Sequence, residues 1–274
     1  MSRLRNLFQT ADWLDVVPPP TEDSAADNYR KTTTLDNVPI EETFIRPEAR
    51  LVYFTDGTSP AADRFRLLRM RLQEFWKSGK LKKLLITSPL PNDGKTTVAL
   101  NLTTALAEHE RRKVLLIEAD LHHSPLVEAL GLAPGIGLAQ CLEEGSDPAA
   151  ALRYLKPLGW YLLPAGKASG NPTALLQTDR LPMILEQLAP LFDCIVLDSP
   201  PVLPVTDSLI LKKCTDASLL VTRAGRTSQD AVDEALTLLG KQHVLGIILN
   251  GIEGLDRAYS KYGYSYYGAG SNRS

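Results

Sequence analysis

The sequence predicts an α/β domain built on a doubly wound, mostly parallel sheet. Short runs that are apolar throughout alternate with amphipathic helical stretches along most of the chain. Such runs are typical of strands buried on both faces, as in a parallel sheet whose crossover helices cover each side. The 274 residues are 44% hydrophobic and 23% charged, which suits a globular protein with one substantial core.

The domain is predicted to span residues 59–254. Ser59-Pro60 is a typical helix start, and the stretch PAADRFRLLRMRLQEFWKS that follows carries an apolar stripe at helical spacing. Helices are also predicted over TVALNLTTALAEH and QDAVDEALTLLGKQ. The predicted strands are the apolar runs at residues 84–87 (LLIT), 113–117 (KVLLI), 160–163 (WYLL), 194–198 (CIVLD), 218–222 (SLLVT) and 244–250 (VLGIILN).

The two ends of the chain lack this alternation. Residues 1–16 form a short amphipathic segment, which is either a docking or membrane-surface helix or a frayed terminus. Residues 17–58 are rich in Pro, Asp, Glu and Thr without an apolar period, so a flexible linker is predicted there. Residues 255–274 are rich in Gly, Ser and Tyr, which predicts a flexible tail.

The overall charge and the cysteines exclude several classes of protein. Thirty Lys plus Arg against 32 Asp plus Glu give a net charge of -2, so no global basic field points to nucleic acid or an anionic membrane. The three cysteines lack metal-ligand spacing and no signal peptide precedes them, which favours the cytoplasm. No apolar run reaches the roughly 20 residues of a membrane helix, so at a membrane the protein would have to be held by something other than a spanning helix in this sequence.

A phosphate-binding loop is the clearest motif. Strand 84–87 runs directly into SPLPNDGKTT and then into a predicted helix, and this order lets backbone N–H groups and a helix N-terminus cradle phosphates. Lys95 would reach the β- and γ-phosphates, and the Thr96 hydroxyl would ligate Mg²⁺. Pro89 stands where the general motif has its first glycine. The predicted nucleotide-binding residues are Pro91, Asn92, Asp93, Gly94, Lys95, Thr96 and Thr97.

Carboxylates follow two of the predicted strands, at the edge where the phosphate loop should lie. VLLIEAD offers Glu118 and Asp120, and CIVLDSPP offers Asp198. Taken singly, Asp120 or Asp198 could equally be a helix cap. The predicted catalytic set consists of Lys95, Glu118, Asp120 and Asp198. Asp120 and Asp198 also join Thr96 as predicted Mg²⁺ ligands.

Tyrosines are concentrated near the end of the chain. Five of the nine lie within nine residues, interleaved with glycine and serine, so they should be exposed phenols. Exposed phenols beside an ATP site are candidate phosphoryl acceptors, although an interaction tail or a low-complexity end would have the same composition. These candidate acceptors are Tyr259, Tyr262, Tyr264, Tyr266 and Tyr267.

From Ser59 to Tyr267 the sequence resembles the bacterial tyrosine kinases of capsule and exopolysaccharide synthesis. SPLPNDGKTT resembles their Walker A loop, in which a proline at the position of Pro91 is usual. EADLHHSP is similar to their DxDLRRP, and IVLDSPPVLPVTDS to their IIDTPPVxxVTDA. LLPAGKASGNPTALL, the later strand segments LLVTRAG and VLGIILN, and the tyrosine cluster also match. DRFRLLR is similar to their ExxRxxR oligomerisation motif, with Asp63, Arg66 and Arg69 in its charged positions.

The resemblance implies a P-loop NTPase fold of the Min and partition type. It also implies an enzyme that uses ATP and Mg²⁺ to phosphorylate tyrosines on the tail of a neighbouring subunit in a homo-oligomeric ring. Implied partners are a separate membrane-spanning adaptor, which would recruit the protein to the inner face of the plasma membrane, and a cognate tyrosine phosphatase, with no nucleic acid. Glu118 replaces an Asp thought to help deprotonate the phenol, and His122-His123 replace a basic pair, so slow phosphotransfer is expected.

Two other classes of protein share these motifs. A Min- or partition-type ATPase would carry a signature lysine five residues before Lys95, where this chain has Leu90. A regulatory pseudokinase of polysaccharide export would bind the nucleotide but lack phosphotransfer, through the changes at Glu118 and the two histidines. Phosphotyrosine formation separates the kinase from both.

Overall fold

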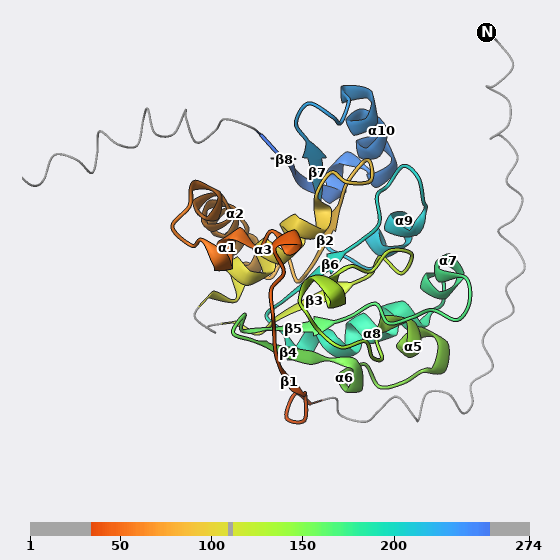
Figure 1. Ribbon diagram of the computed structural model, residues 1–274. Coiled ribbons are helices and arrows are strands. Elements are labelled where there is room, and N and C mark those ends of the chain that lie inside the picture. The colour runs from red at the N-terminus through yellow and green to blue at the C-terminus, as the bar shows by residue number, and fades with distance from the viewer. Residues whose placement is uncertain (1–33, 109–111, 253–274) are drawn as a thin grey trace, which may run out of the picture. The chain divides into compact units, whose positions relative to one another are not determined.

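The computed structural model describes residues 34–108 and 112–252. These residues form an eight-stranded sheet in the order β1-β4-β5-β3-β6-β2-β7-β8 (Figure 1). Every pair of neighbouring strands is parallel except β4 and β5, which are antiparallel. The predicted doubly wound, mostly parallel sheet is therefore confirmed. The strands are β1 (Ile40–Glu42), β2 (Lys83–Thr87), β3 (Val114–Glu118), β4 (Arg153–Lys156), β5 (Trp160–Leu163), β6 (Cys194–Asp198), β7 (Ala217–Arg223) and β8 (Val244–Asn250).

The helices form a layer on each face of the sheet (Figure 1). One layer consists of α1 (Val52–Thr55), α2 (Pro60–Lys77), α3 (Lys95–Leu106) and α4 (Leu126–Ala129). The other consists of α5 (Leu138–Glu144), α6 (Pro148–Ala151), α7 (Pro172–Leu176), α8 (Arg180–Leu188), α9 (Asp207–Lys212) and α10 (Gln229–Leu239). Single-turn 3₁₀ helices lie at η1 (Pro47–Ala49), η3 (Ala189–Leu191) and η4 (Lys241–His243).

The apolar runs account for both layers, because alternate side chains of one strand enter opposite cores. In β2, Leu84 and Ile86 belong to the core beneath α2 and α3, whereas Leu85 belongs to the core beneath α8. All five residues of β3 and of β6 are buried. Burial on both faces is the reason these strands are uninterrupted apolar runs.

Part of the predicted linker is structured, so that prediction is wrong for residues 40–55. β1 pairs in parallel with β4, and Leu35 and Val38 pack against the core on the α8 face. Leu51 is 1% exposed and Tyr53 7%. β1 has only three residues and lies at the sheet edge, so it carries no apolar run, and tertiary contacts rather than local pattern hold it. Residues 17–33 of the predicted linker, like residues 1–16, lie outside the described part.

The last strand also differs from its prediction. The run VLGIILN was expected to be buried on both faces, but β8 is the other edge strand and its residues alternate between half-buried and exposed. Leu245, Ile247 and Leu249 are 38%, 49% and 56% exposed. An apolar run alone cannot distinguish a central strand from an edge strand, because position in the sheet is a tertiary property. Within the described ranges, no helix is long and apolar enough to cross a membrane.

Candidate nucleotide-binding and catalytic site

The phosphate loop connects β2 to α3 at the carboxyl edge of the sheet. Gly94 has a φ of 97° and directly precedes Lys95, the first residue of α3. A Cβ atom at position 94 would come within 2.0 Å of the Asn250 amide nitrogen, so only glycine fits this position. Asn92 also has a positive φ, of 66°, a conformation that asparagine tolerates better than most residues. The sequence of the loop thus matches its backbone geometry.

Side chains and the ends of β7 and β8 hold the loop in this shape. The Asp93 carboxylate, 3% exposed, accepts hydrogen bonds from the Leu90 amide at 3.1 Å and the Thr227 hydroxyl at 2.8 Å. The Thr227 hydroxyl in turn accepts the Arg223 amide at 2.8 Å. The Asn250 amide donates to the Asp93 carbonyl at 3.0 Å. Asp93, predicted to bind nucleotide, therefore shapes the loop from within.

Lys95 faces the carboxylates of the neighbouring strands. Its ammonium lies 3.3 Å from an Asp120 carboxylate oxygen, and both side chains are largely buried. It also lies 3.4 Å from the Thr96 hydroxyl. The other Asp120 oxygen accepts the His123 amide at 3.0 Å, which fixes the turn after β3. Phosphate oxygens would compete with Asp120 for the Lys95 ammonium, because both are anionic acceptors.

Asp198, the last residue of β6, is fully buried. Neither of its carboxylate oxygens makes a hydrogen bond of standard geometry among the described residues, and the neighbouring polar groups are the Thr96 hydroxyl and the Lys95 ammonium. Burial raises the pKa of Asp198 to about 6, against the opposing effect of the nearby Lys95 charge. An unsatisfied buried carboxylate is costly, so its retention beside a phosphate loop indicates a cation-binding role.

The donors around Asp198 fit a magnesium ion. Asp198, Asp120 and the Thr96 hydroxyl are all hard oxygen ligands, which Mg²⁺ prefers. The described residues include no cluster of three or more His, Cys, Asp or Glu side chains that could hold a metal by themselves. Two carboxylates and a hydroxyl match the usual Mg²⁺ site, in which one or two carboxylates act together with water and substrate phosphates.

Glu118 lies beside Asp198 but has a different environment. It is fully buried, and its two oxygens accept the Leu126 amide at 2.7 Å and the Ala165 amide at 3.1 Å. Burial is the main cause that raises the pKa of Glu118 to about 7, and the two backbone hydrogen bonds oppose it. The two hydrogen bonds join the loops after β3 and β5 through the Glu118 side chain. The role of base for Glu118 stays a prediction.

The histidine pair divides between two surroundings. The His122 ring lies 3.0 Å from the buried Asp207 carboxylate, whose other oxygen accepts the Thr173 hydroxyl at 2.7 Å. This contact joins the loop after β3 to α7 and α9. His123 instead lines a pocket that opens over the phosphate loop.

A pocket of about 420 Å³ opens over the phosphate loop. Five of the predicted nucleotide-binding residues line it, whereas Pro91 and Asp93 do not. Sequence reasoning missed the contributions of Glu48 and Arg50, which lie in the predicted linker, and of the ends of β7 and β8. The lining residues are Glu48, Arg50, Asn92, Gly94, Lys95, Thr96, Thr97, His123, Pro125, Arg223 and Asn250.

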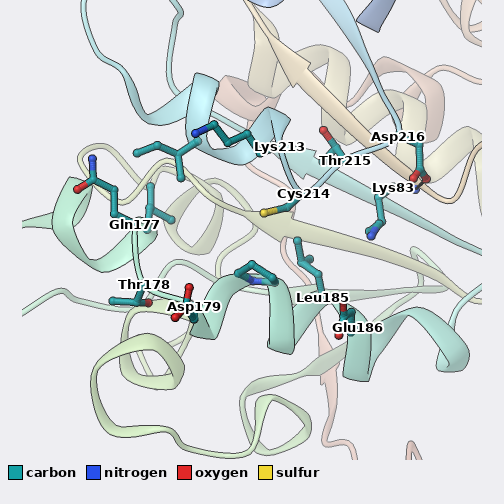
Figure 2. A pocket seen from close by; sticks show the side chains of 13 residues that line it. Lys83, Gln177, Thr178, Asp179, Leu185, Glu186, Lys213, Cys214, Thr215 and Asp216 are labelled. Carbon is teal, nitrogen blue, oxygen red and sulfur yellow. Dashed lines mark hydrogen bonds between the residues drawn. The ribbon is translucent and has the colours of Figure 1, made fainter. Parts of the chain in front are cut away.

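A second cavity, of about 570 Å³, lies at the opposite edge of the sheet (Figure 2). Lys83 at the start of β2 and Asp216 just before β7 mark that amino edge. Cys214 and the acidic residues of the α7–α8 region, Asp179 and Glu186, also line it. The cavity holds none of the residues predicted for catalysis, although it is the larger of the two.

The charged residues of the predicted oligomerisation motif have partners within the chain. The Arg66 guanidinium donates to Asp63 at 2.6 Å and to the Gly57 carbonyl, and lies 5.3 Å from the centre of the Tyr53 ring. Arg69 donates to the Ala105 carbonyl at 3.0 Å and pairs with Glu108. These contacts fasten α2 to α1 and α3. The tyrosine cluster, from Tyr259 to Tyr267, lies outside the described residues.

A loop of this geometry at the carboxyl edge of a parallel sheet, with buried carboxylates beside it, defines a P-loop nucleotide-binding protein. Solved structures agree. The kinase domain of the Escherichia coli tyrosine kinase ETK aligns with a TM-score of 0.70 and 27% identity over 74% of this chain and 80% of that one. The septum site-determining protein MinD of Pyrococcus horikoshii, solved with Mg-ADP, aligns with a TM-score of 0.53 and 25% identity over 61% and 69%.

Curated relatives identify the family. The tyrosine-protein kinase YwqD of Bacillus subtilis is 30% identical over 230 residues, 83% of this chain and 94% of that protein. The tyrosine-protein kinase CpsD of Streptococcus pneumoniae is 34% identical over 188 residues, 67% and 81% of the two chains. The chain spans only 31% of the longer tyrosine-protein kinase Wzc of Salmonella typhimurium. No family model matches. The chain belongs to the bacterial tyrosine kinases and is a protein-tyrosine kinase with a nucleotide-binding P-loop fold.

Proposed function

We propose that this kinase transfers the γ-phosphoryl group of ATP to tyrosines of its own C-terminal cluster, on a neighbouring subunit. The observation that supports this most is the fully buried Asp198 carboxylate, which has only the Lys95 ammonium and the Thr96 hydroxyl to compensate its charge. This set provides a cation for the phosphates and oxygen ligands for Mg²⁺, the two requirements of phosphoryl transfer. By the same proposal, the reaction regulates the synthesis and export of a capsular or extracellular polysaccharide.

In the proposed step the phenolic oxygen bonds to the γ-phosphorus while the bond from that phosphorus to the β–γ bridging oxygen breaks. ADP leaves with the electron pair and the phenolic proton is released. Lys95 holds the β- and γ-phosphates, and Asp120 positions the Lys95 ammonium. Bound Mg²⁺ would neutralise charge on the phosphates, with Thr96, Asp120 and Asp198 as its protein ligands.

The position of the chain end supports the choice of acceptor. Asn250, the last residue of β8, contacts the phosphate loop, and the described chain ends at Ile252. The first tyrosine of the cluster is Tyr259, nine residues beyond Asn250, and nine residues span at most roughly 30 Å when extended. This spacing supports the tail as acceptor for the ATP site of the same or of an adjacent subunit, and the mixing experiment separates the two.

Transfer between subunits is tested by mixing two inactive proteins. One carries Lys95→Ala and keeps the tail, and the other keeps Lys95 and lacks residues 258–274. We expect neither to form phosphotyrosine alone with ATP and Mg²⁺, and the mixture to label the Lys95→Ala chain. Lys83→Ala, at the opposite edge of the sheet, is the matched control and should retain activity. Label elsewhere in the chain, or activity of Lys95→Ala alone, would refute the assignment.

One observation favours the regulatory pseudokinase as a second candidate. The Glu118 carboxylate is bound to two backbone amides, so it is less available to the acceptor phenol as a base. If the parent protein binds ATP and Mg²⁺ but forms neither phosphotyrosine nor ADP, this reading replaces the first. ADP formation without phosphotyrosine would instead indicate a Min-type ATPase.

Two associations belong to the same proposal. We propose that the protein forms a homo-oligomeric ring. In this ring, the N–H groups of Arg66 and Arg69 that make no hydrogen bond within their own chain would donate to the adjacent subunit. We also propose that a separate membrane-spanning adaptor binds the kinase. Sedimentation of Arg66→Ala/Arg69→Ala tests the ring, since loss of the larger species with the fold intact is expected.

A further inference from the structure

The segment before α1 reaches the nucleotide pocket. Its backbone is held to the end of α4, because the Phe44 and Arg46 amides donate to the Leu130 and Ala129 carbonyls at 3.2 and 3.1 Å. The chain then turns through η1, and Glu48 and Arg50 join the lining of the pocket over the phosphate loop. A stretch that looks like a linker in sequence is thus one wall of the candidate active site.

Arg50 is held in an unusual backbone conformation. Its φ and ψ are 48° and 41°, in the left-handed region that non-glycine residues rarely adopt. Such a conformation persists only where the surrounding structure enforces it, and it is concentrated at functional sites. Here both neighbours are anchored, since Ala49 is 4% and Leu51 1% exposed.

The helix that carries the phosphate-binding residues supplies this constraint. Asn101 is fully buried on α3, and its amide donates to the Arg50 carbonyl at 2.9 Å while its oxygen accepts the Tyr53 amide at 2.9 Å. The same side chain donates to the Thr97 carbonyl at 2.8 Å. Arg50 is therefore fixed relative to the first turn of α3, which begins at Lys95.

The Arg50 side chain is left available by this arrangement. It is exposed, and the described residues provide no hydrogen bond or ion pair to its guanidinium. Arg46, four residues earlier, is by contrast paired with Glu128 at 3.1 Å. A guanidinium that lines a phosphate pocket without a carboxylate partner matches the geometry of phosphate oxygens, to which it can donate two hydrogen bonds at once.

We propose that Arg50 is a nucleotide-binding residue that donates to the phosphates of ATP or ADP in this pocket, a role that rests on the proposed nucleotide use of the site. Glu48 lies on the same wall and places a negative charge there. Arg50 therefore attracts a phosphate ligand, whereas Glu48 repels it, and both charges affect the affinity of the pocket.

The test measures the dissociation constant of a fluorescent ATP analogue with Mg²⁺. Arg50→Gly removes the guanidinium and keeps a residue suited to the left-handed conformation. We expect about tenfold weaker binding at low salt, a smaller difference at high salt because of screening, and partial rescue by Arg50→Lys. Glu48→Gln should tighten binding, and Arg46→Ala is the matched control that should leave binding unchanged.

The outcomes separate this inference from the proposed function. If Arg50→Gly binds the analogue as tightly as the parent, Arg50 is not a ligand of the nucleotide. If Arg50→Gly weakens binding equally at low and high salt and also lowers the melting temperature, its role is structural and the inference fails. If neither the parent nor Lys95→Ala binds the ATP analogue, the proposed nucleotide use of the site is refuted, independently of Arg50.

Discussion

Replacing Asp198 with asparagine should change how the stability of the protein depends on pH. The carboxylate is fully buried, and its pKa is raised to about 6 from the usual 3.8. A group whose pKa is raised on folding favours the folded state while it is protonated, and this contribution is lost as the pH rises through the folded pKa. Asparagine has nearly the same size and does not titrate in this range.

The size of the effect follows from the pKa values. The shift of about two pKa units corresponds to roughly 3 kcal/mol of unfolding free energy over the whole titration. About 2 kcal/mol of this is expected to be lost between pH 4.5 and pH 7.5. The parent should therefore lose about 2 kcal/mol relative to Asp198→Asn over that interval.

Urea denaturation at the two pH values measures this difference directly. Asp230→Asn, at an exposed position of α10, is the matched control and should follow the parent. MgATP should stabilise the parent at pH 7.5 more than it stabilises Asp198→Asn, because the variant lacks a carboxylate for the metal. If the stability difference between the parent and Asp198→Asn is the same at both pH values, Asp198 is not the buried titrating group described above.

Three further substitutions test how the site is supported. Thr227→Val removes a hydroxyl that donates to the buried Asp93 carboxylate, so it should cost about 2 kcal/mol and weaken nucleotide binding, whereas Thr227→Ser should stay near the parent in urea denaturation. Glu118→Asp shortens the side chain by one methylene and should lose at least one of its two hydrogen bonds to backbone amides. The melting temperature measured by calorimetry should fall by about 4–8 °C. An unchanged melting temperature would contradict the role of Glu118 in joining the loops after β3 and β5. Asn101→Ala breaks the tie to the segment around Tyr53, so limited proteolysis should cleave near residues 40–55 faster than in the parent, and equal rates would count against the tie.

The central strands and the phosphate loop were predictable because their signals are local. A strand buried on both faces must be apolar at every position, as β3 and β6 are, and a loop that wraps phosphates needs glycine at a position such as Gly94. The sequence alone therefore determined the fold class and the position of the phosphate loop, and its resemblance to known motifs gave the kinase family. It also determined that Asp120 and Asp198 lie at the carboxyl edge, since both follow buried parallel strands.

Tertiary structure decided the features that depend on contacts distant in sequence. β1 exists because β4 pairs with it, and Arg50 reaches the nucleotide pocket because Asn101, 51 residues later, holds its carbonyl. Glu118 has the residue type of a catalytic base, yet two amides from other loops occupy its oxygens. Local sequence specifies which groups a residue can offer. Only packing determines which of those groups remain free for chemistry, because hydrogen-bond partners of buried polar atoms come from elements far apart in the chain.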